Sequence, residues 1–222
     1  MSRHLKSYAV PRSWTLLKKV NKWTTRPLPG AHPFATSMPI ALLLKQLGFA
    51  RNAKEVKQIL NEKNVTVDGK TITLPHAQIG FMDVIKIKPD VSLRCLLDEK
   101  GRLVFKTTNE ITKKICKIRG KSPVKGGKVQ LNLSDGRNVL VNKNESKTGD
   151  SVVIEIPDQK ITETLPLEKG CTVFLVSGRN KGTIAQVESI TGEKVQCKGK
   201  NVFETLKKSV FVIGKNEPAV KI

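Results

Sequence analysis

Positively charged side chains are the most frequent chemically active groups in this sequence. Its 222 residues include 40 lysines and arginines against 19 aspartates and glutamates, a net charge of +21 at pH 7. The first 38 residues carry seven of these cations and no acidic residue. Solubility alone needs far less charge, so the excess predicts a partner rich in negative charge. The phosphate backbone of a nucleic acid is such a partner, because lysines and arginines neutralise phosphates and release their counterions.

Both tryptophans of the chain lie in this acid-free segment. Trp14 and Trp23 have lysines close by in the sequence, and an aromatic ring among cations suits stacking on an RNA base or sugar. The alternative, which we favour, is that both rings anchor the segment onto a neighbouring domain. Several prolines predict an extended path, apart from one short helix expected at 12–20. So basic an arm is expected to be poorly ordered without a polyanion beside it.

A second candidate phosphate site lies at the start of an expected helix. Asn52-Ala53-Lys54-Glu55 matches a capping box, with Asn52 as the N-cap. Arg51 precedes this helix, and backbone N–H groups at a helix start favour an anion. Arg51, Lys54 and the helix end are therefore predicted to hold a phosphate together, with Lys57 further along. The alternative for each residue taken singly is a solvated lysine face.

A third candidate is the loop Gly178-Arg179-Asn180-Lys181-Gly182, between strands expected at 172–176 and 183–190. Its backbone N–H groups and two cations suit phosphate contact. The same pattern is also that of an ordinary hairpin closed by glycines.

The segment 39–88 has the elements needed to position the second site. Ile40, Leu43, Leu44 and Leu47 share one helical face, and a second apolar face follows in the next helix. Asp68-Gly69 predicts a two-residue hairpin turn, and a last strand is expected at 84–87. The pattern predicts a module of two helices and three strands, ααβββ.

Short β-forming runs dominate the next segment, 89–165. They predict a small barrel-like or sandwich domain, with one short helix at 108–114. The fold class expected for the whole chain is α+β and mostly β. The expected strands are 103–105, 114–121, 126–133, 137–142 and 150–157.

Metal and catalytic chemistry are not expected. Cys95, Cys116, Cys171 and Cys197 lack paired zinc-ligand spacing, so reduced, packed cysteines and no metal or other cofactor are expected. Asp83 is the nearest candidate for a catalytic acid, but an acid in a turn or at a strand edge is the favoured interpretation. No apolar run spans a bilayer and no secretory signal is apparent, so a cytoplasmic protein without a membrane partner is expected.

Three phrases of the module, LLLKQLGFARNAKEVKQIL, VTVDGK and GFMDVIKI, resemble the S4 (alpha-L) RNA-binding domain. The hairpin at 172–190 resembles a KOW motif, an SH3-like barrel whose defining glycine matches Gly182. With the proline-rich arm and the phrase VKGGKVQLNLSDGRN, the whole order is similar to the ribosomal protein S4e family of archaea and eukaryotes, and closest to archaeal members. Leu74–Gly80 departs from the family pattern.

The resemblance implies a structural, non-enzymatic role in the small ribosomal subunit, supporting translation and subunit assembly. The implied partners are small-subunit ribosomal RNA and neighbouring ribosomal proteins, without a small-molecule substrate. The expected segments are a basic arm (1–38), the S4-type module (39–88), a central β domain (89–165) and a KOW-like domain (166–222). The side chains expected to contact RNA are Arg3, His4, Lys6, Arg12, Trp14, Lys18, Lys19, Lys22, Trp23, Arg26, His32, Lys45, Arg51, Lys54, Lys57, Arg179, Asn180 and Lys181. The expected turn glycines are Gly69, Gly136, Gly178 and Gly182.

Two other classes are compatible with parts of the sequence. An RNA-modifying enzyme can carry an S4 module as its targeting domain, but it needs a catalytic domain of one to two hundred residues. A KOW-bearing transcription factor accounts for neither the S4-type module nor the arm.

Overall fold

The computed structural model describes residues 4–142, 146–199 and 201–220, and it is mostly β with a small helical part. The chain divides into two compact units, which are described separately. The first comprises Met1–Leu96 and Arg102–Ile111, and the second Leu97–Gly101 and Thr112–Ile222. None of the helices in the described residues is long and apolar enough to cross a membrane.

Two helices of the first unit form where the apolar spacing predicts them. Helix α1 (Ile40–Gln46) buries its apolar face and ends before Gly48, whose φ of 79° is costly for other residues. Helix α2 (Ala53–Asn61) buries Val56 and Leu60. Helix α1 is buried from Ile40 to Leu44 and exposes its end, where Leu47 of the predicted apolar face is 39% exposed, whereas α2 has one buried and one exposed face.

A five-stranded sheet in the order β5-β4-β7-β8-β9 completes this module. The predicted hairpin turn is present, because Asp68 and Gly69 have φ values of 49° and 74° and join β4 to β5. Strands β8 and β9 extend the sheet past residue 88, so the compact unit does not end where the module was expected to end. The strands are β4 (Val65–Val67), β5 (Lys70–Thr71), β7 (Val84–Ile87), β8 (Val91–Leu97) and β9 (Leu103–Thr107).

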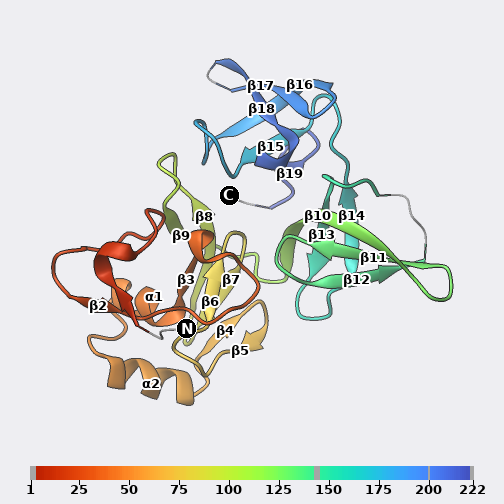
Figure 1. Cartoon of the computed structure of the whole chain (residues 1–222). Coiled ribbons are helices and arrows are strands. Elements are labelled where there is room, and N and C mark those ends of the chain that lie inside the picture. The colour runs from red at the N-terminus through yellow and green to blue at the C-terminus, as the bar shows by residue number, and fades with distance from the viewer. Residues whose placement is uncertain (1–3, 143–145, 200, 221–222) are drawn as a thin grey trace. The chain divides into compact units, whose positions relative to one another are not determined.

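The N-terminal arm has a defined path along this module, drawn in red and orange in Figure 1. The expectation of a poorly ordered arm is therefore wrong for its described residues. Residues 12–20, all described, form turns and irregular chain where a helix was predicted. The reason is that Ser13 and Trp14 donate side-chain hydrogen bonds to the backbone at Ala35 and Ser37. The arm's elements are β1 (Leu5–Lys6), a 3-10 turn (Ser7–Ala9), β2 (Trp23–Thr24), a 3-10 turn (Phe34–Thr36) and β3 (Ser37–Pro39), which pairs with β6 (Gln78–Gly80).

The second unit begins with a five-stranded sheet in the order β12-β11-β10-β13-β14. Its core consists of Cys116, Ile118, Leu131, Leu133, Val152 and Ile154. The helix predicted at 108–114 is wrong, because Lys113 and Lys114 pair with Glu155 and Ile154 as the start of β10. The strands are β10 (Lys113–Val124), β11 (Lys128–Leu133), β12 (Asn138–Val141), β13 (Ser151–Glu155) and β14 (Ile161–Leu165).

The chain ends in a second five-stranded sheet of this unit, ordered β18-β17-β16-β15-β19. Alternating buried valines such as Val173, Val187 and Val195 form its core. All four cysteines are buried and none of them forms a disulfide, as expected from their scattered positions. The elements are β15 (Thr172–Leu175), β16 (Ile184–Thr191), β17 (Lys194–Lys198), β18 (Val202–Leu206), a 3-10 turn (Lys207–Ser209) and β19 (Val210–Gly214).

Candidate RNA-binding surfaces

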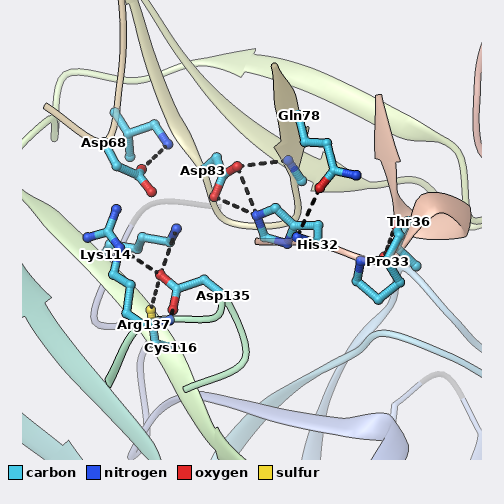
Figure 2. Close-up of polar contacts among 12 residues, drawn as sticks. His32, Pro33, Thr36, Asp68, Gln78, Asp83, Lys114, Cys116, Asp135 and Arg137 are labelled. Carbon is cyan, nitrogen blue, oxygen red and sulfur yellow. Dashed lines mark hydrogen bonds and ion pairs between the residues drawn. The ribbon is translucent and has the colours of Figure 1, made fainter. Parts of the chain in front are cut away.

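A buried histidine fixes the arm to the module. Nε2 of His32 lies 3.0 and 2.9 Å from the two carboxylate oxygens of Asp83, and both side chains are buried (Figure 2). Asp83 also accepts a hydrogen bond of 2.8 Å from the Gly80 amide. A Cβ on Gly80 would lie 2.2 Å from Cγ of His32, so only glycine leaves room for this ring. Asp83 is thus a buried turn acid that holds the arm.

A buried tryptophan gives the arm a second anchor. Trp14 is 3% exposed, its indole N–H donates to the carbonyl of Ser37, and its ring lies 5.8 Å from that of Phe34. Trp14 and His32 were both predicted to contact RNA. That prediction is wrong for these two side chains, because each is enclosed by the unit that it holds together.

The segment that departs from the family pattern, Leu74–Gly80, contacts the arm. Nδ1 of His76 lies 2.7 Å from the carbonyl of Arg26, and Oε1 of Gln78 accepts a hydrogen bond of 3.2 Å from the His32 amide. The backbone of β6 pairs with β3 in the same region. Sequence reasoning missed this contact, since a short polar stretch rich in turns carries no periodic signal.

The cations of the arm face solvent while its anchors are buried. Trp23, unlike Trp14, is 50% exposed. Arg26 is half-buried, and Arg3 lies outside the described residues. The exposed members of the predicted set in the arm are His4, Lys6, Arg12, Lys18, Lys19 and Lys22.

The start of α2 differs from the predicted phosphate site. Oδ1 of Asn52 accepts hydrogen bonds of 3.0 and 3.1 Å from the Lys54 and Glu55 amides, and the Glu55 carboxylate accepts from the Arg51 amide at 2.7 Å. The capping box is therefore confirmed, and it occupies the N–H groups that a phosphate would need. The N-terminus of α2 is therefore not available to bind a phosphate. The exposed side chains of Arg51, Lys54 and Lys57 remain as candidate ligands.

Further cations of the module adjoin the arm or line a hollow. Lys45 is exposed at the end of α1, where Gln46 donates a hydrogen bond of 2.8 Å to the backbone of Thr15 in the arm. Exposed Lys86 and Lys88 line a hollow with Asn64 and Pro89. Lys86 and Lys88 were not predicted as a site. Their alternation with Ile85 and Ile87 was the signal that could have placed both lysines on one exposed face of the strand.

In the second unit, the predicted loop forms the turn between β15 and β16. Gly178 and Gly182 have φ values of 97° and 80°, and the Gly182 amide donates to Leu175 at 2.7 Å. Arg179 is exposed, whereas Asn180 and Lys181 are half-buried. The backbone carbonyl of Asn180 accepts from the Thr183 hydroxyl at 2.7 Å, so it serves the turn. Arg179 is the best placed of the three for a ligand.

A buried charge cluster in the second unit was not predicted. Lys114 on β10 lies 3.1 Å from Oδ2 of Asp135, which is also 3.2 Å from Nε of Arg137 and accepts from the Cys116 thiol (Figure 2). Gly136, with a φ of 76°, makes the tight turn that brings these residues together. Burial alone raises the pKa of the Asp135 carboxyl, but Lys114 and Arg137 outweigh it and hold that pKa below its usual range.

Lys117 joins the two sheets of this unit. Its Nζ donates hydrogen bonds of 2.6 Å to each of the carbonyls of Lys207 and Val210, and one of 3.3 Å to Lys208. Burial, with a smaller contribution from Arg119, lowers the pKa of Lys117 to about 8. Lys117 therefore stabilises the second unit. A lysine in so basic a protein would otherwise be expected to contact a phosphate.

Three family models match consecutive parts of the chain. The RS4NT (NUC023) domain matches residues 1–35, the S4 domain residues 38–85, and the ribosomal family S4e residues 89–161.

Several archaeal proteins are similar to the chain over its full length. The small ribosomal subunit protein eS4 of Methanocaldococcus jannaschii is 37% identical, with 99% of this chain and 97% of that protein covered. The eS4 protein of Methanosphaera stadtmanae is also 37% identical, with 99% and 95% covered. The crystal structure of the 30S ribosomal protein S4e from Thermoplasma acidophilum is 28% identical with a TM-score of 0.71, covering 81% of this chain and 96% of that one.

Proposed function

The chain belongs to the small ribosomal subunit protein eS4 family, and on that premise we propose that it is a structural constituent of the small ribosomal subunit that binds ribosomal RNA. One observation carries the proposal for this chain. In the described arm, the side chains that hold the fold are buried and every lysine and Arg12 are exposed, so a fixed frame presents positive charge to solvent. The role supports translation and subunit assembly and needs no catalytic step, cofactor or small-molecule substrate.

The proposed mode of binding is recognition of phosphates and helix shape. Double-helical RNA has a deep, narrow major groove that side chains cannot read, which leaves phosphates and 2′-hydroxyls as the accessible groups. Lysine and arginine side chains on a fixed frame neutralise phosphates and release counterions. A frame that is already folded also loses little conformational entropy on binding.

Each segment contributes to this binding in the proposal. Segment 1–38 presents the arm cations, and segment 39–88 presents Arg51, Lys54 and Lys57. The segment 89–165 acts as the central β domain, and 166–222 adds Arg179 in a KOW-like turn. Neighbouring small-subunit proteins meet the surfaces that RNA leaves uncovered.

Co-sedimentation with small ribosomal subunits through a gradient of moderate salt tests the proposal. The wild-type chain is expected to travel with the subunits, and a chain with Arg51→Ala, Lys54→Ala and Lys57→Ala is expected to be released at lower salt. Lys194→Ala is the matched control, because its ammonium already lies 3.6 Å from the Glu204 carboxylate. A wild-type chain that stays at the top of the gradient would contradict the proposal.

A further inference from the structure

The arm carries an exposed aromatic surface whose cations are arranged around one indole ring. We define the Trp23 surface as His4, Lys6, Tyr8, Lys22 and Trp23. Trp23 is 50% exposed and Tyr8 is 71% exposed. Large aromatic side chains are rarely left this accessible in a group unless they bind something.

The backbone fixes the geometry of this surface. Strand β1 pairs with β2 so that Lys6 is opposite Trp23, and the Ser7 amide donates a hydrogen bond of 3.0 Å to the carbonyl of Lys22. The side-chain hydroxyl of Ser7 donates to the carbonyl of Asn21. The two strands are thereby held together at the point where the aromatic rings emerge.

Two ammonium groups lie near the indole ring. Nζ of Lys6 lies 5.9 Å from the centre of the Trp23 ring and 5.6 Å from that of Tyr8, and Nζ of Lys22 lies 5.6 Å from that of Trp23. The His4 ring is tilted by 51° with its centre 5.4 Å away. These distances are near the outer limit of a cation–π contact, so the ammonium groups are held loosely, and Trp23 stays 50% exposed.

We propose that the Trp23 surface binds one unpaired nucleotide of RNA, whose base stacks on the indole and whose phosphates meet Lys6 and Lys22. The proposal rests on the proposed function. Every base has a flat face that can stack on an aromatic ring, but a base inside a duplex already stacks on its neighbours. The surface therefore selects unpaired nucleotides, a property that the phosphate contacts elsewhere do not supply.

Charge favours RNA over a protein as the occupant. The described arm contains no acidic residue, and two ammonium groups, those of Lys6 and Lys22, lie near the exposed rings. Trp14 provides the contrast within the same arm, since it is buried and its N–H is bonded to Ser37. Of the two roles that the sequence suggests for the tryptophans, Trp14 therefore has that of an anchor, and Trp23 is proposed to have that of a stacking surface.

Binding of the full chain to a short RNA that contains one 2-aminopurine tests the inference. The probe is used as a single strand and annealed to its complement, because 2-aminopurine loses fluorescence when it stacks on an aromatic ring. Trp23→Leu is expected to weaken binding to the single strand by about 5- to 100-fold and to remove the quenching. Binding to the duplex and the salt slope are expected to stay unchanged, since no cation is lost.

Two further variants complete the test. Trp23→Phe keeps a ring and is expected to retain most of the quenching, and Leu17→Ala removes another exposed apolar side chain of the arm as the matched control. Equal single-strand binding by wild type and Trp23→Leu, or an equal loss on both probes, overturns the inference. A failure of the proposed function looks different, because wild-type binding to both probes would then be insensitive to salt.

Discussion

At the scale of single residues, the surroundings decide which of two like side chains is enclosed and which stays exposed to a ligand. His32 lies in the interior against Asp83, whereas His4 is exposed beside Trp23. The sequence identified both as candidates because they share an acid-free segment. Burial could not be predicted for His32, since its partner Asp83 is 51 residues away and no periodic pattern links them.

The packing of His32 against Gly80 predicts a local loosening of the arm. Gly80→Ala places a methyl group 2.2 Å from Cγ of His32 and is expected to cost about 1–3 kcal/mol by displacing the ring. Trypsin should then cleave within the arm faster than in wild type. Gly120→Ala is the control, because its Cβ meets only Asn132 at 3.6 Å. Equal cleavage rates in both variants would show that His32 does not hold the arm.

Arg51 is predicted to contact a phosphate without reading sequence. Arg51→Ala should weaken binding to all RNAs similarly and lower the salt slope by about one. The measurement is the dissociation constant for two RNAs of unrelated sequence over a range of salt concentrations. A variant that loses affinity for one RNA alone would indicate base recognition instead.

At the scale of elements, local patterns predicted most of the secondary structure and long-range contacts decided the rest. The helices at α1 and α2, the Asp68-Gly69 turn and the strand β7 follow from periodicity and turn chemistry. The predicted helix at 108–114 failed because pairing with β13 outweighs local preference there. Strands such as β18 and β19 were missed because no turn signal as strong as Asp-Gly precedes them.

The buried cluster beneath the β11–β12 turn is predicted to stabilise the second unit. Asp135→Asn leaves Lys114 buried without the carboxylate and should reduce the free energy of unfolding by about 3–5 kcal/mol. Asp158→Asn, in an exposed turn, should change it by less than about 0.5 kcal/mol. Urea unfolding of the three proteins gives both values.

The same variant has a predicted pH dependence. The fold lowers the pKa of Asp135, so its contribution is fully present above the usual aspartate pKa of about 3.9 and is lost as the pH falls through the folded-state value. The difference between wild type and Asp135→Asn should stay constant from about pH 5 to pH 7 and shrink below about pH 4. A constant difference down to pH 3 would mean that the carboxylate is not ion-paired.

Lys117 is predicted to make stability rise with pH as Asp135 does, but in a more alkaline range. Its folded-state pKa of about 8 lies below the ordinary value of 10.5, so the unfolded chain binds more protons between these values. The stability of wild type should therefore rise relative to Lys117→Met as the pH increases from about 8 to 10. Urea unfolding at four pH values, with exposed Lys128→Met as the control, measures this slope. A slope shared by both variants would exclude a desolvated Lys117.

At the scale of the whole molecule, the charge balance predicted the class of partner but not the surfaces that meet it. The net charge of +21 indicates a polyanion however the cations are arranged. Their separation into exposed residues and the buried or scaffold lysines Lys114 and Lys117 depends on the tertiary structure. Composition therefore predicts the chemistry of binding, and packing determines which cations are available.

The affinity of the full chain for small-subunit ribosomal RNA, measured from 50 to 200 mM salt, tests phosphate recognition most directly. With six to ten phosphate contacts, affinity should fall linearly on logarithmic axes by about 10³- to 10⁵-fold over this range. Replacing Arg51, Lys54 and Lys57 together by alanine should lower the slope by about three. Affinity that is the same at both salt concentrations would contradict the proposed recognition of the phosphate backbone.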